Sequence, residues 1–183
     1  RYTGFEKLQL TETQDLSLIS GIESITITGS QAATTSLTKL SAVQASNLTV
    51  AESHDSNGAT ASGTARNLTV ALSIASGSAD SVTLNLASAT AATNVEVENL
   101  SIVGVETLNV NATTGTAATD STLGFVSGGA DKLTAINVTG TADVSLLAGN
   151  AAKAVTVDAT ALTGDFSFEG NIVKASVITA GAG

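Results

Sequence analysis

The chain has 183 residues, of which 13% are charged and 3% aromatic, so it has few large side chains with which to fill a wide core. Its formal net charge of −9 argues against nucleic acid as a partner, because phosphates would be repelled, and makes cations the better small-molecule candidates. The absence of cysteine excludes a disulfide framework, a cysteine nucleophile and a thiolate metal site, and no apolar stretch approaches the roughly 18 residues of a membrane span.

Apolar residues recur two positions apart along the chain, with Thr and Ser between them. This alternation predicts short strands that each bury one face, in a protein that is nearly all β. Clusters of Gly, Asn, Asp and Ser between these strands predict turns. Two Ala-rich stretches, residues 36–46 and 88–100, are compatible with a short helical turn. In chain order, the apolar sets are Ile25 and Ile27, Leu48 and Val50, Leu68 and Val70, Val82 with Leu84 and Leu86, Leu100 and Ile102, and Ile136 and Val138.

Three heptapeptides share one pattern: GFEKLQL at residues 4–10, GIESITI at 21–27 and GVETLNV at 104–110. Each contains glycine, an apolar residue, glutamate, any residue, and then an apolar, polar, apolar alternation. We interpret the glycine as a tight corner and the next residue as turning inward. The last two apolar residues then face the core from a strand, and the glutamate lies at the bend, where it stays solvated or reaches a cation.

In the C-terminal part, apolar residues in phase with the strands begin every 11 residues, at Val144, Val155, Phe166 and Val177. Equal spacing of similar short strands is typical of stacked architectures, in which each unit buries its apolar face only against its neighbours. Two such half-turns predict a coil of about 22 residues and a stack of about eight coils, ~4.8 Å apart. The predicted fold is therefore an all-β β-solenoid (parallel β-helix) with short strands and Gly, Asn and Asp turns. A β-sandwich is the alternative.

We expect residues 1–183 to form a single elongated β domain, with residues 51–63 as an insertion loop. Because the chain contains no methionine, we also expect it to be a fragment of a larger protein or a processed product.

Residue types with catalytic chemistry are scarce. The only histidine, His54, lies in ESHDSNG, and neighbours in sequence do not easily converge into a catalytic relay. The carboxylates lack the spacing of an acid and base pair, and the glycine clusters lack the lysine or helix of a phosphate-binding loop. We therefore predict that the chain is not an enzyme.

Several carboxylates beside Gly, Asn and Ser are candidate calcium ligands, because calcium takes about six to eight oxygen atoms from side chains and carbonyls. The members of one group lie within a phrase that recurs in SGSADSVT (76–83), SGGADKLT (127–134) and, in shorter form, GTADVS (140–145). We expect them at equivalent turns. A second group lies near the C-terminus. For each Asp the alternative is an Asx turn, in which the carboxylate accepts backbone hydrogen bonds. The predicted metal ligands are Asp80, Asp131 and Asp143 in the first group and Asp158, Asp165 and Glu169 in the second.

Five Asn residues lie in Asn-x-Ser/Thr sequences. We attribute these sequences to the pairing of Asn turns with Thr-rich strands rather than to glycosylation. They are Asn47, Asn67, Asn99, Asn111 and Asn137.

The repeated heptapeptides, LTAINVTGTADVSLL at 133–147, AVTVDATALTGDFSF at 154–168 and ITAGAG at 178–183 together resemble bacterial surface-layer (S-layer) proteins and related large secreted β-solenoid proteins associated with RTX calcium-binding repeats. The calcium-binding nonapeptide GGxGxDxφx itself, with φ apolar, is not present: GGADKL at 128–133 lacks the second glycine step. The resemblance implies a structural role, with subunits exported to the cell exterior that tile into a lattice held by calcium.

Two functions remain as hypotheses. The first is a structural, self-assembling domain of an extracellular bacterial surface layer, with copies of itself as partners, calcium-assisted contacts and cell-surface polysaccharide reached through other domains. Low lysine content and the absence of proline leave strand edges poorly guarded, which suits self-association. The alternative is an adhesin or carbohydrate-binding β-solenoid module.

Overall fold

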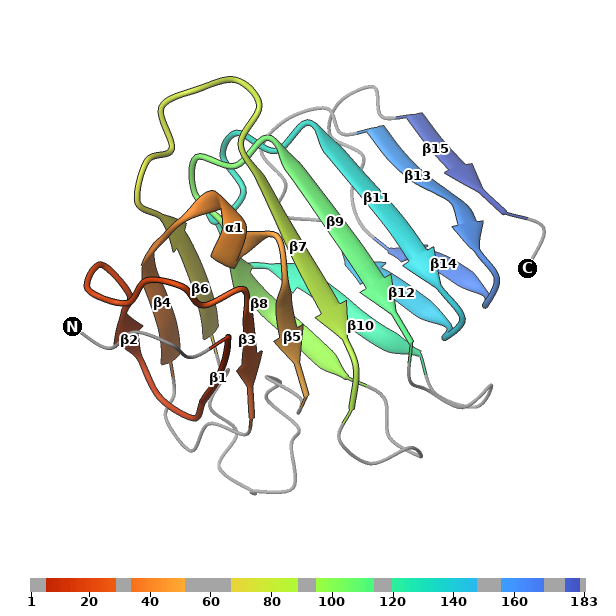
Figure 1. Ribbon diagram of the computed structural model, residues 1–183. Helices are drawn as coiled ribbons and strands as arrows, with labels where there is room; N and C mark the ends of the chain where they lie inside the picture. Colours follow the sequence, from red (N-terminus) through yellow and green to blue (C-terminus); the bar gives the residue numbers. More distant parts are fainter. Residues whose placement is uncertain are drawn as a thin grey trace.

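A computed structural model describes residues 6–28, 34–51, 67–88, 95–113, 120–147, 156–169 and 177–181. In these ranges the chain winds as a parallel β-solenoid, because successive strands alternate between two sheets and each pairs in parallel with the next strand of its own sheet. Figure 1 shows the two sheets as the two layers of one stack, which runs from β1 to β15. The predicted all-β solenoid is confirmed.

The odd-numbered strands form an eight-stranded sheet and the even-numbered strands a seven-stranded sheet. The eight-stranded sheet contains β1 (Lys7–Leu10), β3 (Ser24–Ile27), β5 (Leu48–Val50), β7 (Ser81–Leu86), β9 (Thr107–Ala112), β11 (Ala135–Gly140), β13 (Thr156–Leu162) and β15 (Val177–Ala180). The seven-stranded sheet contains β2 (Gln14–Asp15), β4 (Thr34–Leu40), β6 (Asn67–Leu72), β8 (Glu96–Ser101), β10 (Ser121–Phe125), β12 (Val144–Leu147) and β14 (Phe166–Glu169).

Two sheets also face each other in a β-sandwich, the alternative fold, but a sandwich is built from antiparallel sheets. All pairings between the described strands are parallel instead. A chain that returns to the same sheet in the same direction after each circuit is a solenoid.

Coil length varies along the stack. Val144 pairs with Phe166, 22 residues later, which is the predicted repeat. Leu48 pairs with Leu84, 36 residues later, so the coil between them is longer. Apart from Ala51, the predicted insertion loop of residues 51–63 lies outside the described residues and inside this longer coil.

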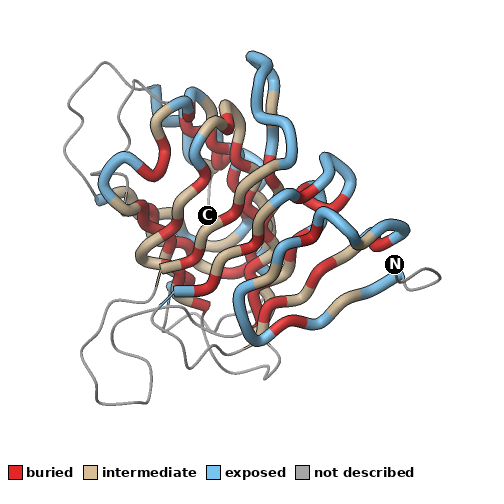
Figure 2. Tube along the Cα trace, turned by 90° about the vertical axis from the view of Figure 1, so that its left-hand side faces the viewer, coloured by how far each residue is buried: buried red, intermediate tan, exposed pale blue. Residues whose placement is uncertain are grey.

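The interior is a narrow pile of aliphatic side chains. Figure 2 shows buried residues alternating with more exposed ones along the strands. Because neighbouring strands lie ~4.8 Å apart, each inward side chain contacts those of the coils above and below it. One column of register partners in the eight-stranded sheet contains Ile25, Leu48, Leu84, Val110 and Val138, each no more than 1% exposed.

The repeated heptapeptides form the corners that lead into the eight-stranded sheet. Gly21 and Gly104 have φ of +82° and +84°, which side-chain-bearing residues rarely adopt. Ile22 and Val105, which follow them, are buried, whereas Glu23 is exposed. The interpretation of the pattern as one corner followed by one strand is therefore confirmed for the second and third copies. In the first copy, Gly4 and Phe5 lie outside the described residues.

A single helical turn, α1 (Ala42–Ala45), occurs in the first Ala-rich stretch, between β4 and β5. Ser41 and Gln44 form a capping box: Ser41 Oγ accepts from the Gln44 N–H at 3.3 Å, and Gln44 Oε1 accepts from the Ser41 N–H at 2.9 Å. The second Ala-rich stretch forms strand β8 where it is described, with no helix there. No helix in the described ranges has the length and hydropathy needed to cross a membrane.

Candidate functional site

The first group of predicted calcium ligands does not occupy equivalent turns. Asp80 directly precedes β7, in the eight-stranded sheet, whereas Asp143 directly precedes β12, in the seven-stranded sheet. Asp131 lies four residues before β11, because Leu133 first turns into the core. The prediction of equivalent positions was wrong: the shared phrase fits turns at both corners of the coil, and only the surrounding strands decide which corner it forms.

At the corner that leads into the eight-stranded sheet, the carboxylates accept backbone hydrogen bonds. Asp131 Oδ1 accepts from the N–H of Gly104, on the preceding coil, at 2.9 Å. Glu106 Oε2 accepts from the N–H of Asp80 at 3.0 Å, and Asp80 Oδ2 accepts from the N–H of Gly77 at 3.2 Å. These bonds join neighbouring coils or close a turn. Asp80 accepts a local backbone hydrogen bond, as the alternative to a calcium site predicts, but the donor lies three residues before it and not two residues after it as in an Asx turn.

The second group of predicted ligands is spread over three parts of the coil. Asp158 lies in β13, Asp165 at the corner between β13 and β14, and Glu169 at the end of β14, in the opposite sheet. Asp143 Oδ1 accepts from the Asp165 N–H at 2.8 Å, so these two residues are neighbours on successive coils. Among the described residues, no three or more Asp, Glu or His side chains lie close enough to hold a metal ion together.

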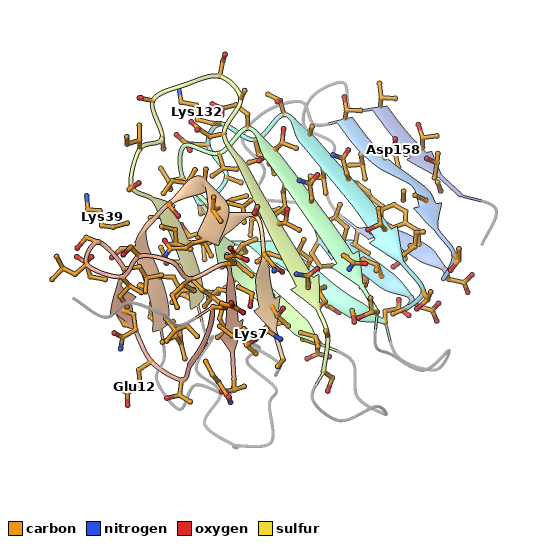
Figure 3. The ribbon with its side chains drawn as sticks, viewed as in Figure 1. Lys7, Glu12, Lys39, Lys132 and Asp158 are labelled. Atoms are coloured by element: carbon orange, nitrogen blue, oxygen red, sulfur yellow. The ribbon has the colours of Figure 1, made fainter. Side chains whose placement is uncertain are left out.

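Asp158 projects from the outer surface of β13 (Figure 3). The Thr160 hydroxyl donates to Asp158 Oδ1 at 2.7 Å and the Thr160 N–H donates to the same oxygen at 3.0 Å. These two hydrogen bonds, the hydroxyl first, favour the ionised form and hold the pKa of Asp158 below its ordinary value of 3.8. Its hydrogen bonds are therefore those of a local turn. His54, by contrast, lies outside the described residues.

Two outward-facing surfaces are more continuous than any carboxylate group. The first, the polar sheet face, is the outer surface of the eight-stranded sheet. Register pairing stacks its side chains into two columns of mostly Asn and Thr. One column contains Thr83, Asn109, Asn137, Asp158 and Thr179, and the other contains Gln9, Thr26, Thr49, Asn85, Asn111 and Thr139.

Side-chain amides of the polar sheet face bond to one another from coil to coil. Asn85 Nδ2 donates to Asn47 Oδ1 at 3.1 Å and to the Leu48 carbonyl at 3.2 Å, and Asn85 Oδ1 accepts from Asn111 Nδ2 at 3.2 Å. In the other column, Asn137 Nδ2 donates to Asn109 Oδ1 at 2.8 Å. Much of the hydrogen-bonding capacity of this face is therefore used within the chain.

The second surface, the aliphatic corner, consists of Leu18, Val43, Ile74 and Val103. Each lies in one of four consecutive turns from the seven-stranded to the eight-stranded sheet, and their exposed fractions are 78%, 59%, 72% and 54%. Six large apolar residues are exposed in the described ranges, and the other two, Val177 and Ile178, belong to β15. Single exposed aliphatic residues are ordinary, but a row on neighbouring turns indicates an interaction surface.

Contacts link the first turn to the second, the second to the strands that flank the third, and the third to the fourth. Gln44 Nε2, in α1, donates to the Ile19 carbonyl of the preceding turn at 3.3 Å, and α1 also packs against β6 and β7. A Cβ on Gly104 would lie 3.0 Å from Ala75 Cβ, so the third and fourth turns also touch. The strands that flank these turns are ~4.8 Å apart, so the turns follow one another along the stack.

The four turns comprise residues 16–23, 41–47, 73–80 and 102–106, and three of them end in a carboxylate: Glu23, Asp80 and Glu106. The fifth turn contains Asp131 and Lys132 and none of the six exposed large apolar residues. Lys132 lies at the upper edge of the molecule in Figure 3. The row of exposed aliphatic side chains is therefore limited to the first four turns.

Neither surface was identified from the sequence. Asn111 and Asn137 were interpreted as turn residues, but they lie inside β9 and β11, and an alternation with apolar neighbours on both sides is the signal that places them there. For the aliphatic corner, the signal is a large aliphatic residue that interrupts each Ser, Ala and Gly turn, as Ile74 does in SIASGSA.

Comparisons with protein-family models, with curated proteins and with solved structures found no match to this chain.

Proposed function

We propose that the chain is a structural, self-assembling domain of an extracellular bacterial surface layer. The observation that supports this proposal best is the aliphatic corner, a row of four exposed aliphatic side chains on neighbouring turns of the stack. Copies of the chain that meet at this row can bury apolar area against each other, which favours association. The surface-layer identity itself comes from the resemblance of the repeated phrases.

The stack supplies the stiffness that such a role requires. Parallel pairing links every coil to the next, and side chains such as Asp131 and Asn85 add hydrogen bonds along the stack. A rod braced in this way holds its lateral surfaces in fixed positions, which a lattice needs.

In this proposal, calcium acts between copies. The described carboxylates do not fit a calcium cage within one chain, since no three of them gather. Exposed carboxylates of two copies, Asp158 and Glu169 among them, can instead be neutralised by a shared ion, which lowers the repulsion between the rods.

Electron microscopy of the purified chain with and without millimolar calcium tests the proposal. We expect ordered sheets or paracrystalline arrays that form with calcium and disperse when a chelator is added. A chain that stays monomeric at high concentration with calcium present would contradict the proposal. Ordered sheets in chelator alone would support self-assembly and contradict the role of calcium.

The polar sheet face favours a second candidate, an adhesin or carbohydrate-binding module. Its columns of amides and hydroxyls present donors and acceptors that can bond to sugar hydroxyls. A glycan array probed with the chain tests this function. Strong binding to one glycan class that is lost in Asn109→Ala but kept in Ile74→Asp would assign the binding to this face.

A further inference from the structure

Strand pairing changes where the coil of β5 and β6 meets the coil of β7 and β8, a boundary that we call the seam. All six residues of β7 pair in register with β9, but only the last three, Leu84, Asn85 and Leu86, pair with β5. β9 pairs along its whole length with β11 as well. Because parallel pairing supplies the backbone hydrogen bonds between coils, the eight-stranded sheet is held less firmly at the seam than in the two coil boundaries that follow it.

The helical turn α1 lies beside the half of β7 that β5 does not cover. In Figure 1, β5 flanks the lower part of β7 and α1 lies next to its upper part. In the described ranges, no backbone hydrogen bond joins α1 to residues 81–83. α1 therefore packs against this part of the β7 edge without supplying the hydrogen bonds of a strand. Asn85 ties the two sides of the seam through its side-chain bonds to Asn47 and Leu48.

Two residues of β4 lower the stability of the N-terminal unit, which consists of β1–β6 and α1. Thr35 is fully buried, and its Oγ1 has no hydrogen-bond partner in the described part of the chain, so it has lost its bonds to water without a replacement. Lys39 has φ of +60°, a conformation that strains a residue with a Cβ. Neither defect occurs among the described residues of the C-terminal unit, which consists of β7–β14.

We infer that the N-terminal unit opens at the seam as one cooperative unit while the C-terminal unit stays folded. In a stack of repeats, stability is close to a sum over the coils and the interfaces between neighbours, so a weak interface beside strained coils is where opening begins. The open form is a minor state under native conditions, in which β7 becomes an edge strand and Leu48 separates from its register partner Leu84. The inference concerns a single copy of the chain and does not depend on the proposed function.

Native-state hydrogen exchange of the unmodified chain, in chelator and at low protein concentration, tests the seam. The protection factor of an amide is the factor by which the folded chain slows its exchange. We expect protection factors in β3–β5 to be at least about tenfold lower than in β9–β11, because the first group exchanges whenever the N-terminal unit opens. Equal protection of the two groups, or lower protection in β9–β11, would overturn the inference.

Asn137→Ala distinguishes two units from one. It removes the bond to Asn109, which lies wholly inside the C-terminal unit. We expect protection to fall about two- to fivefold in β9 and β11 and to stay unchanged in β3–β5, because the N-terminal unit opens without breaking that bond. A fall of the same size in both groups would show that the stack opens as a whole and would also overturn the inference.

Thr35→Val is the matched change in the N-terminal unit. It replaces the unpartnered hydroxyl by a methyl group of nearly the same shape, so we expect protection in β3–β5 to rise about fivefold. Unchanged protection there would contradict the role of Thr35 in making this unit the weaker one.

Single-cysteine variants give an independent measurement, because the chain has no cysteine of its own. Val50→Cys places a buried thiol in β5 and Val110→Cys places one in β9, and both valines are no more than 1% exposed. We expect a thiol reagent to label Val50→Cys at least about tenfold faster than Val110→Cys, since only the first thiol becomes accessible when the N-terminal unit opens. Equal labelling rates in two variants that are both folded by circular dichroism would overturn the seam.

Discussion

The polar sheet face and the aliphatic corner are neighbouring surfaces of the same coils, but they use their side chains differently. On the polar sheet face, amides such as Asn85 bond to the coils on either side, so the folded chain benefits from them. At the corner, Leu18 and Ile74 are more than 70% exposed and contribute little buried area to the chain itself. The sheet face therefore contributes to the stability of the monomer, whereas the corner side chains contribute little to it and are exposed for the contacts that the proposed self-assembly requires.

The largest expected effect concerns aliphatic residues inside and outside the stack. Leu84 is fully buried, so Leu84→Ala should lower the free energy of unfolding by about 3 to 5 kcal/mol, from lost burial and the cavity left behind. Ile74→Ala, the matched change at the corner, should alter it by less than about 0.5 kcal/mol. Denaturant unfolding at low protein concentration measures both. A comparable loss in Ile74→Ala would mean that the corner serves folding after all.

The next largest effect concerns the space available for a new side chain inside the stack and at the corner. Gly140 ends β11 with φ of +118°, and a Cβ there would collide with the backbone of Ala112 on the preceding coil. Gly128, in the fifth turn on the corner side, has φ of +73° but open space around its Cβ position. We expect Gly140→Ala to lower the free energy of unfolding by about 2 to 3 kcal/mol, because the collision adds to backbone strain. We expect Gly128→Ala to lower it by about 1 kcal/mol, from backbone strain alone. Thermal and denaturant unfolding measure both losses, and equal losses in the two variants would refute this difference in packing.

A smaller effect concerns the amide bonds of the polar sheet face. Asn85→Ala removes three hydrogen bonds between coils and should cost about 1 to 2 kcal/mol. Asn137→Ala removes the bond to Asn109 and should cost about 0.5 to 1 kcal/mol. Both variants should self-associate like the unmodified chain, as judged by sedimentation. If Asn85→Ala lost association without losing stability, the roles assigned to the two surfaces would have to be exchanged.

Most of the fold could be predicted from the sequence. Alternating pairs such as Val82 and Leu84 predict the strands, the 11-residue spacing predicts the coil, and the heptapeptide glycines predict two observed corners. These features are local, because a strand that buries one face must alternate and a corner with positive φ favours glycine. The variation in coil length was visible as irregular spacing, yet no local rule assigns Asp80 and Asp143 to opposite corners.

The surfaces could not be predicted in the same way because they depend on register. Asn85 and Asn111 become neighbours only because β7 and β9 pair with a particular offset, 26 residues apart in the chain. Leu18 and Val103 join one row only because four coils of unequal length stack in order. The calcium prediction used residue types and turn context, which also describe an Asx turn, and the backbone bonds of Asp131 and Asp158 show how such carboxylates are used here.

The smallest effect that we expect is the contribution of Asp158, on the polar sheet face, to the pH dependence of the free energy of unfolding. Its pKa is lower in the folded chain than its ordinary value of 3.8, because the Thr160 hydroxyl and N–H stabilise the carboxylate. A depressed folded pKa gives stability that is present above pH 3.8 and is lost as the pH falls through the folded value. Thr160→Val removes the hydroxyl donor, so it should lower the free energy of unfolding slightly at pH 7 and converge with the unmodified chain in strong acid. Because Asp158 is exposed, solvent screens this contribution and keeps it small. The matched control is Thr163→Val, because the Thr163 hydroxyl donates to a carbonyl instead of a carboxylate. Its loss of unfolding free energy should not vary with pH. A Thr160→Val loss equally independent of pH would mean that the hydroxyl acts through packing and not through the charge of Asp158.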